Sequence, residues 1–372
     1  MPPHSASGPG STLPPEIIDI ICCDPLLEID DLHNLRSVSN AFRERAELVL
    51  YRSVELREPT KLRAFCITVV GRPSLALCLR KLVLHLVPQQ DIDPDDLSRM
   101  VKMLRLSKNL RSLFLLNLTP WNSNTSQNEI AIHNWILDGH EFKLTTFMNS
   151  YFVQTRLKKF LETQSELETL ILPCNNDIGL RNISIPSLKN LSSLAKVIPE
   201  LLKHGSTMNL ERLQILLLSH TPESFFTKLN AQLSGRLRCL SIPKYECLKE
   251  GDFKRLVVGV ATHWRAIEYL EIGDYIPLTE NVFQSCSFPS KAMFTHIKKL
   301  VLHIQSLTEE RQLSISTEIM DALPTLKRLV LTKLDSGYQR FQRRAYQYER
   351  NGEIHFSEYD NWDPNEWLSV RF

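Results

Sequence analysis

The stretch "LRKLVLHL" (79–86) decides the fold, because its pattern L-x-x-L-x-L returns along most of the chain. Further copies stand at 110–118, 167–173, 210–218, 237–243, 267–272, 297–304 and 326–334, and weaker ones lie near residues 54, 146 and 190. Alternating leucines of this kind are typical of a strand with one buried face. Successive copies are mostly roughly 25 to 31 residues apart, a period typical of stacked structural repeats.

The segments between the copies have the spacing of helices. In "DPDDLSRMVKMLRL" (93–106), Asp93 can cap a helix and Pro94 suits its first turn. One apolar stripe then follows along the segment: Leu97, Met100, Val101 and Leu104. Strands and helices that alternate with a fixed step predict an α/β solenoid, in which each unit buries its face against its neighbours. An ordinary α/β protein with leucine-rich strands is the alternative.

The front of the chain, "LPPEIIDII" (13–21), predicts a short amphipathic helix. Its apolar residues fall at positions i, i+4, i+7 and i+8, namely Leu13, Ile17, Ile20 and Ile21. A second helix is expected to place four residues on one stripe: Leu32, Leu35, Val38 and Phe42. A third is expected in "FRERAELVLY" (42–51). Three short helices make a small core, which usually needs a neighbour or a partner.

These front residues resemble an F-box. The family's motif opens with Leu-Pro-x-Glu and continues to Leu-x-x-Leu-x-x-Val-Ser-x-x-aromatic, and the chain follows it from Leu13 to about Leu56. In the family this module docks on a Skp-family adaptor, which joins it to a cullin-based ubiquitin ligase. The resemblance implies an adaptor-binding set here of Leu13, Pro14, Glu16, Ile17, Ile20, Ile21, Leu32, Leu35, Val38 and Phe42. Two positions depart from the pattern: Asp24 replaces a leucine, and Phe42 stands where tryptophan is common.

The repeats resemble a degenerate leucine-rich repeat array, and the whole chain is similar to the F-box and leucine-rich repeat proteins of fungi. The family's asparagine ladder is mostly missing, with Asn175 falling on it. The expected fold class is α/β, with an N-terminal three-helix F-box followed by an irregular leucine-rich repeat solenoid. The expected parts are a disordered leader (1–11), the F-box (12–56), the solenoid (57–334) and a C-terminal cap with a hairpin (335–372).

The tail breaks the period from Asp335 onward. In "AYQYERNGEIHFSEY" (345–359), Asn351-Gly352 stands between two alternating runs, which predicts a hairpin with a two-residue turn. Such a turn would place Arg350 opposite Glu353, a favourable cross-strand pair. The basic and aromatic residues of this segment are expected to form a solvated face of the cap rather than a nucleic-acid site.

Charge and composition argue against several classes of protein. Lys+Arg 44 against Asp+Glu 42 leaves a formal net charge of +2, which argues against bulk electrostatic binding to nucleic acid or to an anionic membrane. No apolar run approaches the roughly 20 residues that a membrane-spanning helix needs. The first residues contain neither the basic nor the apolar region of a secretory signal. We therefore expect a cytoplasmic or nuclear protein that binds neither nucleic acid nor membrane.

The sequence contains no recognisable motif for catalysis or for metal binding. The eight cysteines are scattered, without a C-x-x-C pair or a histidine at zinc-site spacing, and are expected to be reduced. The acids of "DIDPDD" (91–96) lack the glycine and glutamate of an EF-hand loop and suit a helix N-terminus instead. No P-loop, G-x-G-x-x-G, H-E-x-x-H or G-x-S-x-G occurs. We therefore expect no catalytic residue, no metal and no cofactor.

A face for a protein substrate follows from the same leucine pattern. The leucines point inward, so the residues between them line the opposite, concave face of the strands. This face would carry an apolar line flanked by charged or titratable side chains, which tends to mark a binding surface. The predicted substrate-binding residues are Lys81, Val83, His85, Phe114, Ile171, Tyr269, Glu271, Lys299, Val301, His303, Arg328 and Val330. The alternative is that loops or the aromatic tail cover this face and make it ordinary core.

The favoured function is a substrate-recognition adaptor of a cullin-RING ubiquitin ligase. Its partners would be a Skp-family adaptor, through it a cullin, and an unidentified protein substrate held by the repeats. The transfer chemistry would belong to other subunits. One alternative is a leucine-rich-repeat interaction scaffold that is not attached to a ligase, and another is an enzyme with an unrecognised site. The sequence does not identify the substrate, because a fold does not fix what its surface binds.

Overall fold

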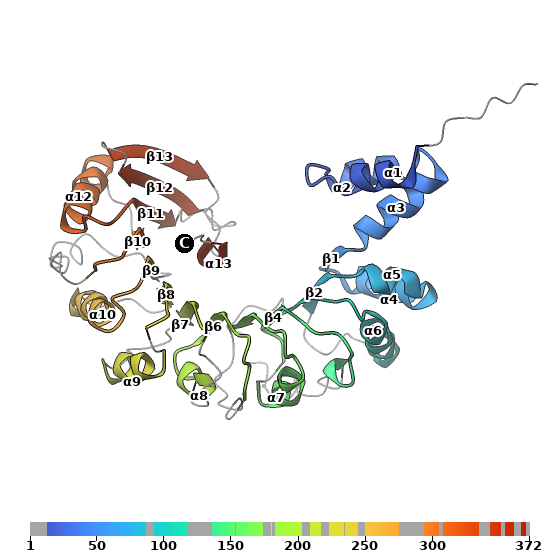
Figure 1. Cartoon of the computed structure of the whole chain (residues 1–372), viewed down its shortest axis with the longest axis horizontal. Coiled ribbons are helices and arrows are strands. Elements are labelled where there is room, and N and C mark those ends of the chain that lie inside the picture. Colours follow the sequence, from blue (N-terminus) through green and yellow to red (C-terminus); the bar gives the residue numbers. More distant parts are fainter. Residues whose placement is uncertain are drawn as a thin grey trace, which may run out of the picture. The chain divides into compact units, whose positions relative to one another are not determined.

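The computed structural model describes residues 13–86, 93–117, 136–152, 154–173, 180, 183–202, 209–216, 223–233, 235–244, 250–274, 294–304, 308–334, 343–350, 354–360 and 366–369. The predicted leader (1–11), Asn175 and the turn Asn351-Gly352 lie outside these residues. The chain forms two compact units, here called the N-terminal unit (Met1–Thr125 with Trp135–Leu144) and the C-terminal unit (Ser126–Asn134 with Thr145–Phe372). Both are mixed α/β, with helices beside a mostly parallel sheet (Figure 1).

The N-terminal unit begins with three helices, α1 (Pro15–Cys22), α2 (Ile29–Leu35) and α3 (Asn40–Leu50). Helix α1 has proline in its first turn, where the missing amide donor is not needed. Glu28 and Asp31 form a capping box at the start of α2. The Ser39 hydroxyl accepts a hydrogen bond from the Phe42 amide at the start of α3, at 3.3 Å. Three helices form in this front region, but the single stripe predicted for the second helix is wrong: α2 ends at Leu35, Val38 lies between the helices and Phe42 belongs to α3.

Three parallel strands complete the N-terminal unit. They are β1 (Ser53–Leu56), β2 (Lys81–Leu86) and β3 (Ser112–Asn117), and the helices between them are α4 (Pro59–Gly71), α5 (Pro73–Cys78) and α6 (Pro94–Leu106). The Asp93 side chain caps α6 by accepting from the Asp95 amide at 2.9 Å. This helix buries the predicted stripe and Met103 besides: Leu97, Met100, Val101, Met103 and Leu104.

The C-terminal unit continues the alternation of strands and helices. Among its described residues, eight strands pair in parallel and in chain order: β4 (Thr146–Asn149), β5 (Thr169–Leu172), β6 (Asn190–Leu194), β7 (Arg212–Leu216), β8 (Cys239–Lys244), β9 (Tyr269–Asp274), β10 (Lys299–Ile304) and β11 (Arg328–Leu334). The helices between them are α7 (Gln154–Glu162), α8 (Ile198–Leu202), α9 (Glu223–Leu233), α10 (Glu250–His263) and α12 (Glu309–Ala322). The unit ends with β12 (Arg343–Arg350), β13 (Ile354–Asp360) and α13 (Glu366–Ser369).

The leucines of the repeated pattern form the core in both units. Leu82 and Leu84 of β2 are fully buried, and so is Leu302 of β10, while Leu300 is 1% exposed. Register places Leu82 directly opposite Leu113 of β3. The inward direction of these leucines is therefore confirmed, because each strand alternates between a buried residue and a residue on the opposite face.

The tail adds two antiparallel strands to the sheet, with β12 paired to β11 and β13 paired to β12. Arg350 lies opposite Ile354, so the expected two-residue turn with Arg350 opposite Glu353 is wrong by one residue. The Arg350 guanidinium instead donates to the carbonyl oxygens of Pro324, at 3.1 Å, and Met320. A cation at the end of α12 satisfies carbonyls that the helix leaves without partners, and this favours the observed register.

Charges of alternating sign stand immediately before successive strands of the C-terminal unit. They are Glu168, Lys189, Glu211, Arg238, Glu268 and Lys298, before β5 to β10 in that order. Lys189 Nζ lies 2.7 Å from a Glu168 oxygen, Arg238 Nη1 lies 3.6 Å from a Glu268 oxygen, and Lys298 pairs with the same Glu268. Each exposed pair contributes little stability. The row as a whole favours this strand register, since opposite charges on neighbouring strands attract.

Candidate functional site

The three front helices have a core of their own. Ile18 and Cys22 of α1 pack with Leu32 of α2 and with Phe42 and Ala46 of α3. All five side chains are at most 7% exposed. Leu32 and Phe42 were assigned to adaptor binding by the resemblance, but here they are core residues that hold the helices together. Two further members of the predicted set pack against this cluster and are half-buried: Ile21 and Leu35.

A group of large apolar side chains on this module is exposed, and we call it the front apolar surface. Its members are Leu13, Ile17, Ile20, Leu26, Ile29 and Val38, with exposed fractions from 41% at Ile17 to 86% at Leu26. Three large apolar residues are exposed elsewhere among the described residues: Ile67, Leu77 and Leu313. Single exposed apolar residues are normal, but a concentration of six within residues 13–38 tends to mark an interaction surface.

The front apolar surface contains four residues of the predicted adaptor-binding set: Leu13, Ile17, Ile20 and Val38. Pro14 and Glu16 of that set are exposed as well. Leu26 and Ile29 are additions that sequence reasoning missed. The signal for them was present in "DPLLEI" (24–29), since two leucines directly after a helix cannot both enter a core this small. The Asp24 carboxylate accepts a hydrogen bond from the Leu26 amide at 2.9 Å and holds this turn.

Contacts within the N-terminal unit fix the front helices to the first strands and helices behind them. Arg72, between α4 and α5, donates through both terminal nitrogens to the two carboxylate oxygens of Glu47 on α3, at 2.7 and 2.8 Å. This bidentate hydrogen bond with Arg72 lowers the pKa of Glu47. The rings of Tyr51 and Phe65 stack with centroids 5.6 Å apart. The three front helices thus pack against the segment around α4 and α5, which supports their small core.

The predicted concave face is accessible in the N-terminal unit. We call it the second strand face, meaning the side opposite the buried leucines. On β2 and β3, Lys81 is exposed, Val83, His85 and Phe114 are half-buried, and the Lys81 ammonium lies 5.5 Å from the Phe114 ring centroid. His85 Nε2 lies 2.8 Å from an oxygen of Glu55 on β1. Hydrogen bonds from Arg57 and, to a smaller degree, His85 lower the pKa of Glu55.

In the C-terminal unit the second strand face is covered, so the predicted substrate-binding residues do not form an open surface there. Most of the residues predicted on this stretch are at most 8% exposed: Ile171, Tyr269, Glu271, Lys299, Val301, His303 and Val330. The indole of Trp367 on α13 packs with Cys239, Tyr269, Val301 and Val330 in one buried cluster. Figure 1 shows α13 lying beside β8. Of the two alternatives that the sequence left open, the covered one therefore holds for β8 to β11, although Arg328 stays half-buried and pairs with Glu349 at 3.0 Å.

A buried polar network lies on the same covered face. His303 Nε2 lies 3.1 Å from a Glu271 oxygen, and the Thr332 hydroxyl lies 2.5 Å from His303 Nδ1. A side chain at Gly273 would place its Cβ 1.8 Å from the His303 ring, so this position requires glycine. Hydroxyl, imidazole and carboxylate also occur together in hydrolases, but these three residues are at most 4% exposed and a substrate would have no access. The network satisfies buried polar groups and stabilises the core.

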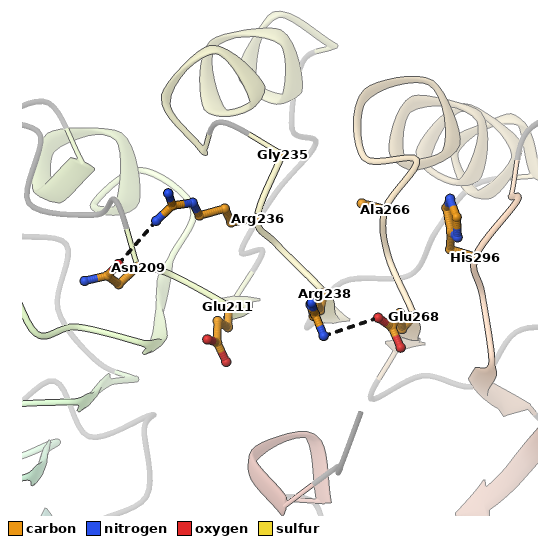
Figure 2. Close-up of a pocket in the computed structure, with 8 residues that line it drawn as sticks. All are labelled: Asn209, Glu211, Gly235, Arg236, Arg238, Ala266, Glu268 and His296. Carbon is orange, nitrogen blue, oxygen red and sulfur yellow. Dashed lines mark hydrogen bonds and ion pairs between the residues drawn. The ribbon is translucent and has the colours of Figure 1, made fainter.

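A pocket of about 560 Å³ lies where the row of alternating charges precedes the strands. Figure 2 shows its lining residues, with Arg236 turned toward Asn209 and Arg238 toward Glu268. Arg236 Nη1 lies 3.3 Å from the Asn209 side-chain oxygen. Because both arginines already have partners and glutamates stand beside them, the pocket presents no cluster of one charge for an ionic ligand.

The described residues hold no group of three or more histidine, cysteine, aspartate or glutamate side chains able to bind a metal ion. The cysteines described are free, and burial raises the pKa of the Cys66 thiol to about 12, so that it stays protonated at neutral pH. Within the part of the chain that the structure covers, no helix is both long and apolar enough to cross a membrane.

Comparison with known proteins does not assign the chain to a family. No protein-family model matches it, and no curated protein matches it. Among solved structures it is similar to a chain of the "Crystal structure of Rad7 and Elc1 complex in yeast", with a TM-score of 0.38 and 14% sequence identity over 84% of this chain and 87% of that chain. At that TM-score the likeness supports no statement about function.

Proposed function

We propose that this chain is a non-catalytic adaptor of a cullin-RING ubiquitin ligase. In this proposal α1 to α3 form an F-box that docks on a Skp-family adaptor, which connects it to a cullin. The strands and helices behind them form an irregular leucine-rich repeat solenoid that holds a protein substrate. Ubiquitin transfer is carried out by other subunits, and the chain works in the cytoplasm or the nucleus.

One observation carries the proposal: the front apolar surface. Six large apolar side chains are exposed on a module that has a buried core of its own and is held to the helices behind it by the pair of Glu47 and Arg72. Exposed aliphatic side chains are not needed to hold such a module together, and they lose contact with water when a partner covers them. The residues at which the sequence resembles the F-box motif supply four of the six.

Adaptor capture tests the proposal. The double variant Ile17→Asp with Ile20→Asp should weaken co-purification of a Skp-family adaptor with the chain by at least about tenfold, because a carboxylate buried in an apolar interface loses its hydration without a partner. Both residues are exposed in the free chain, so thermal unfolding should be unchanged. The matched control is Ile67→Asp on α4, a residue that is 52% exposed outside the front helices; this variant should keep the adaptor.

The result also separates the ligase adaptor from a leucine-rich-repeat scaffold without a ligase. If the unchanged chain does not retain a Skp-family adaptor, or if the double variant retains it as well as the control does, the F-box proposal is wrong. The front apolar surface would then serve another partner, and the scaffold would become the better explanation of the repeats.

A further inference from the structure

Helix α13 occupies the second strand face of the C-terminal unit in the way that a bound segment would. Its Trp367 is 1% exposed and contributes the indole at the centre of a cluster whose other members come from β8, β9, β10 and β11. Leu368 packs against the same cluster and is half-buried. The helix is four residues long, so its place depends on these contacts more than on its own hydrogen bonds.

The main chain of α13 is recognised as well as its side chain. Arg212 Nη1 on β7 donates to the carbonyl oxygen of Trp367 at 3.1 Å and to that of Leu368 at 2.9 Å. The Cys239 thiol donates to the Trp367 carbonyl at 3.5 Å. Carbonyls in the last turn of a helix have no intrahelical partner, and a cation is the favourable group there. These contacts bind the main-chain carbonyls at the end of a helical turn, so they do not depend on the other side chains that the turn carries.

We call the residues around Trp367 the seat: Cys239, Tyr269, Val301 and Val330 with Arg212. The fit of Trp367 in this seat is incomplete. Its indole nitrogen is buried, and no hydrogen-bond acceptor reaches it among the residues that the structure describes. A buried donor without an acceptor loses its hydrogen bond to water and gains none in return. The seat therefore favours an aromatic ring and a helix end but does not favour the indole N–H. An occupant with a phenyl ring would avoid this loss.

We infer that α13 is an internal competitor for the partner-binding face, and that the seat it fills takes a partner segment with an aromatic residue in the last turn of a helix. Binding of such a segment displaces α13. The inference rests on the proposed function in one respect, since it treats the second strand face as the surface that holds the substrate. It names the chemistry of that substrate: an aromatic ring for the apolar cluster, and free helix-end carbonyls for Arg212.

The test uses the full chain and a fluorescent peptide with the sequence of residues 361–372, "NWDPNEWLSVRF". Fluorescence anisotropy measures its binding to the unchanged chain and to two tail variants, Trp367→Ala and Leu368→Asp, whose seat residues are intact. If α13 fills the seat in at least about nine molecules of ten, removing it should tighten peptide binding by at least about tenfold. A peptide with alanine at the position of Trp367 should not bind, and one with phenylalanine there should bind at least as well.

Three results would overturn the inference. Peptide binding could be equal for the unchanged chain and both variants, or the alanine peptide could bind as well as the parent peptide. Both variants could also lose cooperative unfolding, which would make α13 an integral part of the core and not a displaceable segment. Capture of a Skp-family adaptor, measured on the same variants, depends on α1 to α3, so failure of the inference can be told apart from failure of the proposed function.

Discussion

Two strands of nearly the same sequence, "KLVLH" at 81–85 and at 299–303, lie in different surroundings. Their leucines are buried in both units. On the other face, Lys81 is exposed and Val83 is half-buried, whereas Lys299 is 8% exposed and Val301 is fully buried. Even the partner of the histidine is repeated, since His85 faces Glu55 and His303 faces Glu271 on the preceding strand. The pattern alone thus determines the leucine face, whereas the environment of Val301 on the other face is determined by the packing of Trp367 from α13.

The largest expected difference between the two strands concerns the valines. Val301→Asp should lower the free energy of unfolding by at least about 4 kcal/mol, because it places an unpaired carboxylate in a buried apolar cluster. Val83→Asp should cost about 1 kcal/mol, because the half-buried carboxylate keeps contact with water. Urea unfolding followed by circular dichroism measures both. Equal losses would show that the second strand face is covered in both units or in neither.

The leucines provide the matching test in which no difference is expected. Leu82→Ala and Leu300→Ala should each cost about 2–5 kcal/mol, since each removes a buried aliphatic side chain and leaves a cavity. The same urea unfolding experiments apply. A loss below about 1 kcal/mol in one strand alone would mean that the two units differ in their cores as well as in their second faces.

The sequence was informative where the determinant is local. Strand alternation predicted the buried leucines, and the stripe of α6 followed from its 3.6-residue period. On α1 the same reasoning named one apolar face, with Leu13, Ile17, Ile20 and Ile21, and did not name Ile18. Ile18 enters the core with Cys22, and Ile17 and Ile20 stay exposed. Periodicity identifies a stripe, but the helix packed beside it decides which stripe is buried.

The rest depends on contacts between residues far apart in the chain. Trp367 lies 128 residues from Cys239, with which it packs, and no local pattern predicts that distance. Sequence reasoning could name the aromatic tail as one cover for the face but could not choose between covered and open strands. The hairpin register was wrong by one residue for a similar reason, since the contact of Arg350 with the end of α12 lies outside the hairpin itself.

Gly273 gives a smaller and more local test of the covered face. Gly273→Ala should cost about 1–3 kcal/mol, because the added Cβ would overlap the His303 ring in a packed core. Arg57 holds the corresponding position in the N-terminal unit, because it follows Glu55 by two residues as Gly273 follows Glu271. The Arg57 side chain is 72% exposed. The matched control is Gly71→Ala at the end of α4, where nothing lies within 4 Å of the new Cβ. That change should be neutral or slightly stabilising.

His303 makes this test sharper. If the loss in Gly273→Ala comes from overlap with the imidazole, the double variant with His303→Ala should lose less than the sum of the two single variants, because the smaller side chain gives the new Cβ room. A strictly additive pair would mean that alanine at position 273 destabilises β9 by another route.

The smallest expected effect belongs to the open face. The pKa of Glu55 is lowered in the folded chain, mainly by its hydrogen bond with Arg57 and further by His85, so the ionised carboxylate stabilises the fold. A lowered pKa contributes stability above the unfolded value, near 4.5, and this contribution disappears as the pH falls through the folded value. Because the Glu55 side chain is 44% exposed, water screens the pair, and Glu55→Gln should cost only a few tenths of a kcal/mol at pH 7. At pH 3 the unchanged chain and the variant should unfold at nearly the same urea concentration. A loss that exceeds about 1 kcal/mol at pH 7, or one that persists at pH 3, would show that Glu55 is buried by a neighbour as Glu271 is, and the contrast between the two strands would fail.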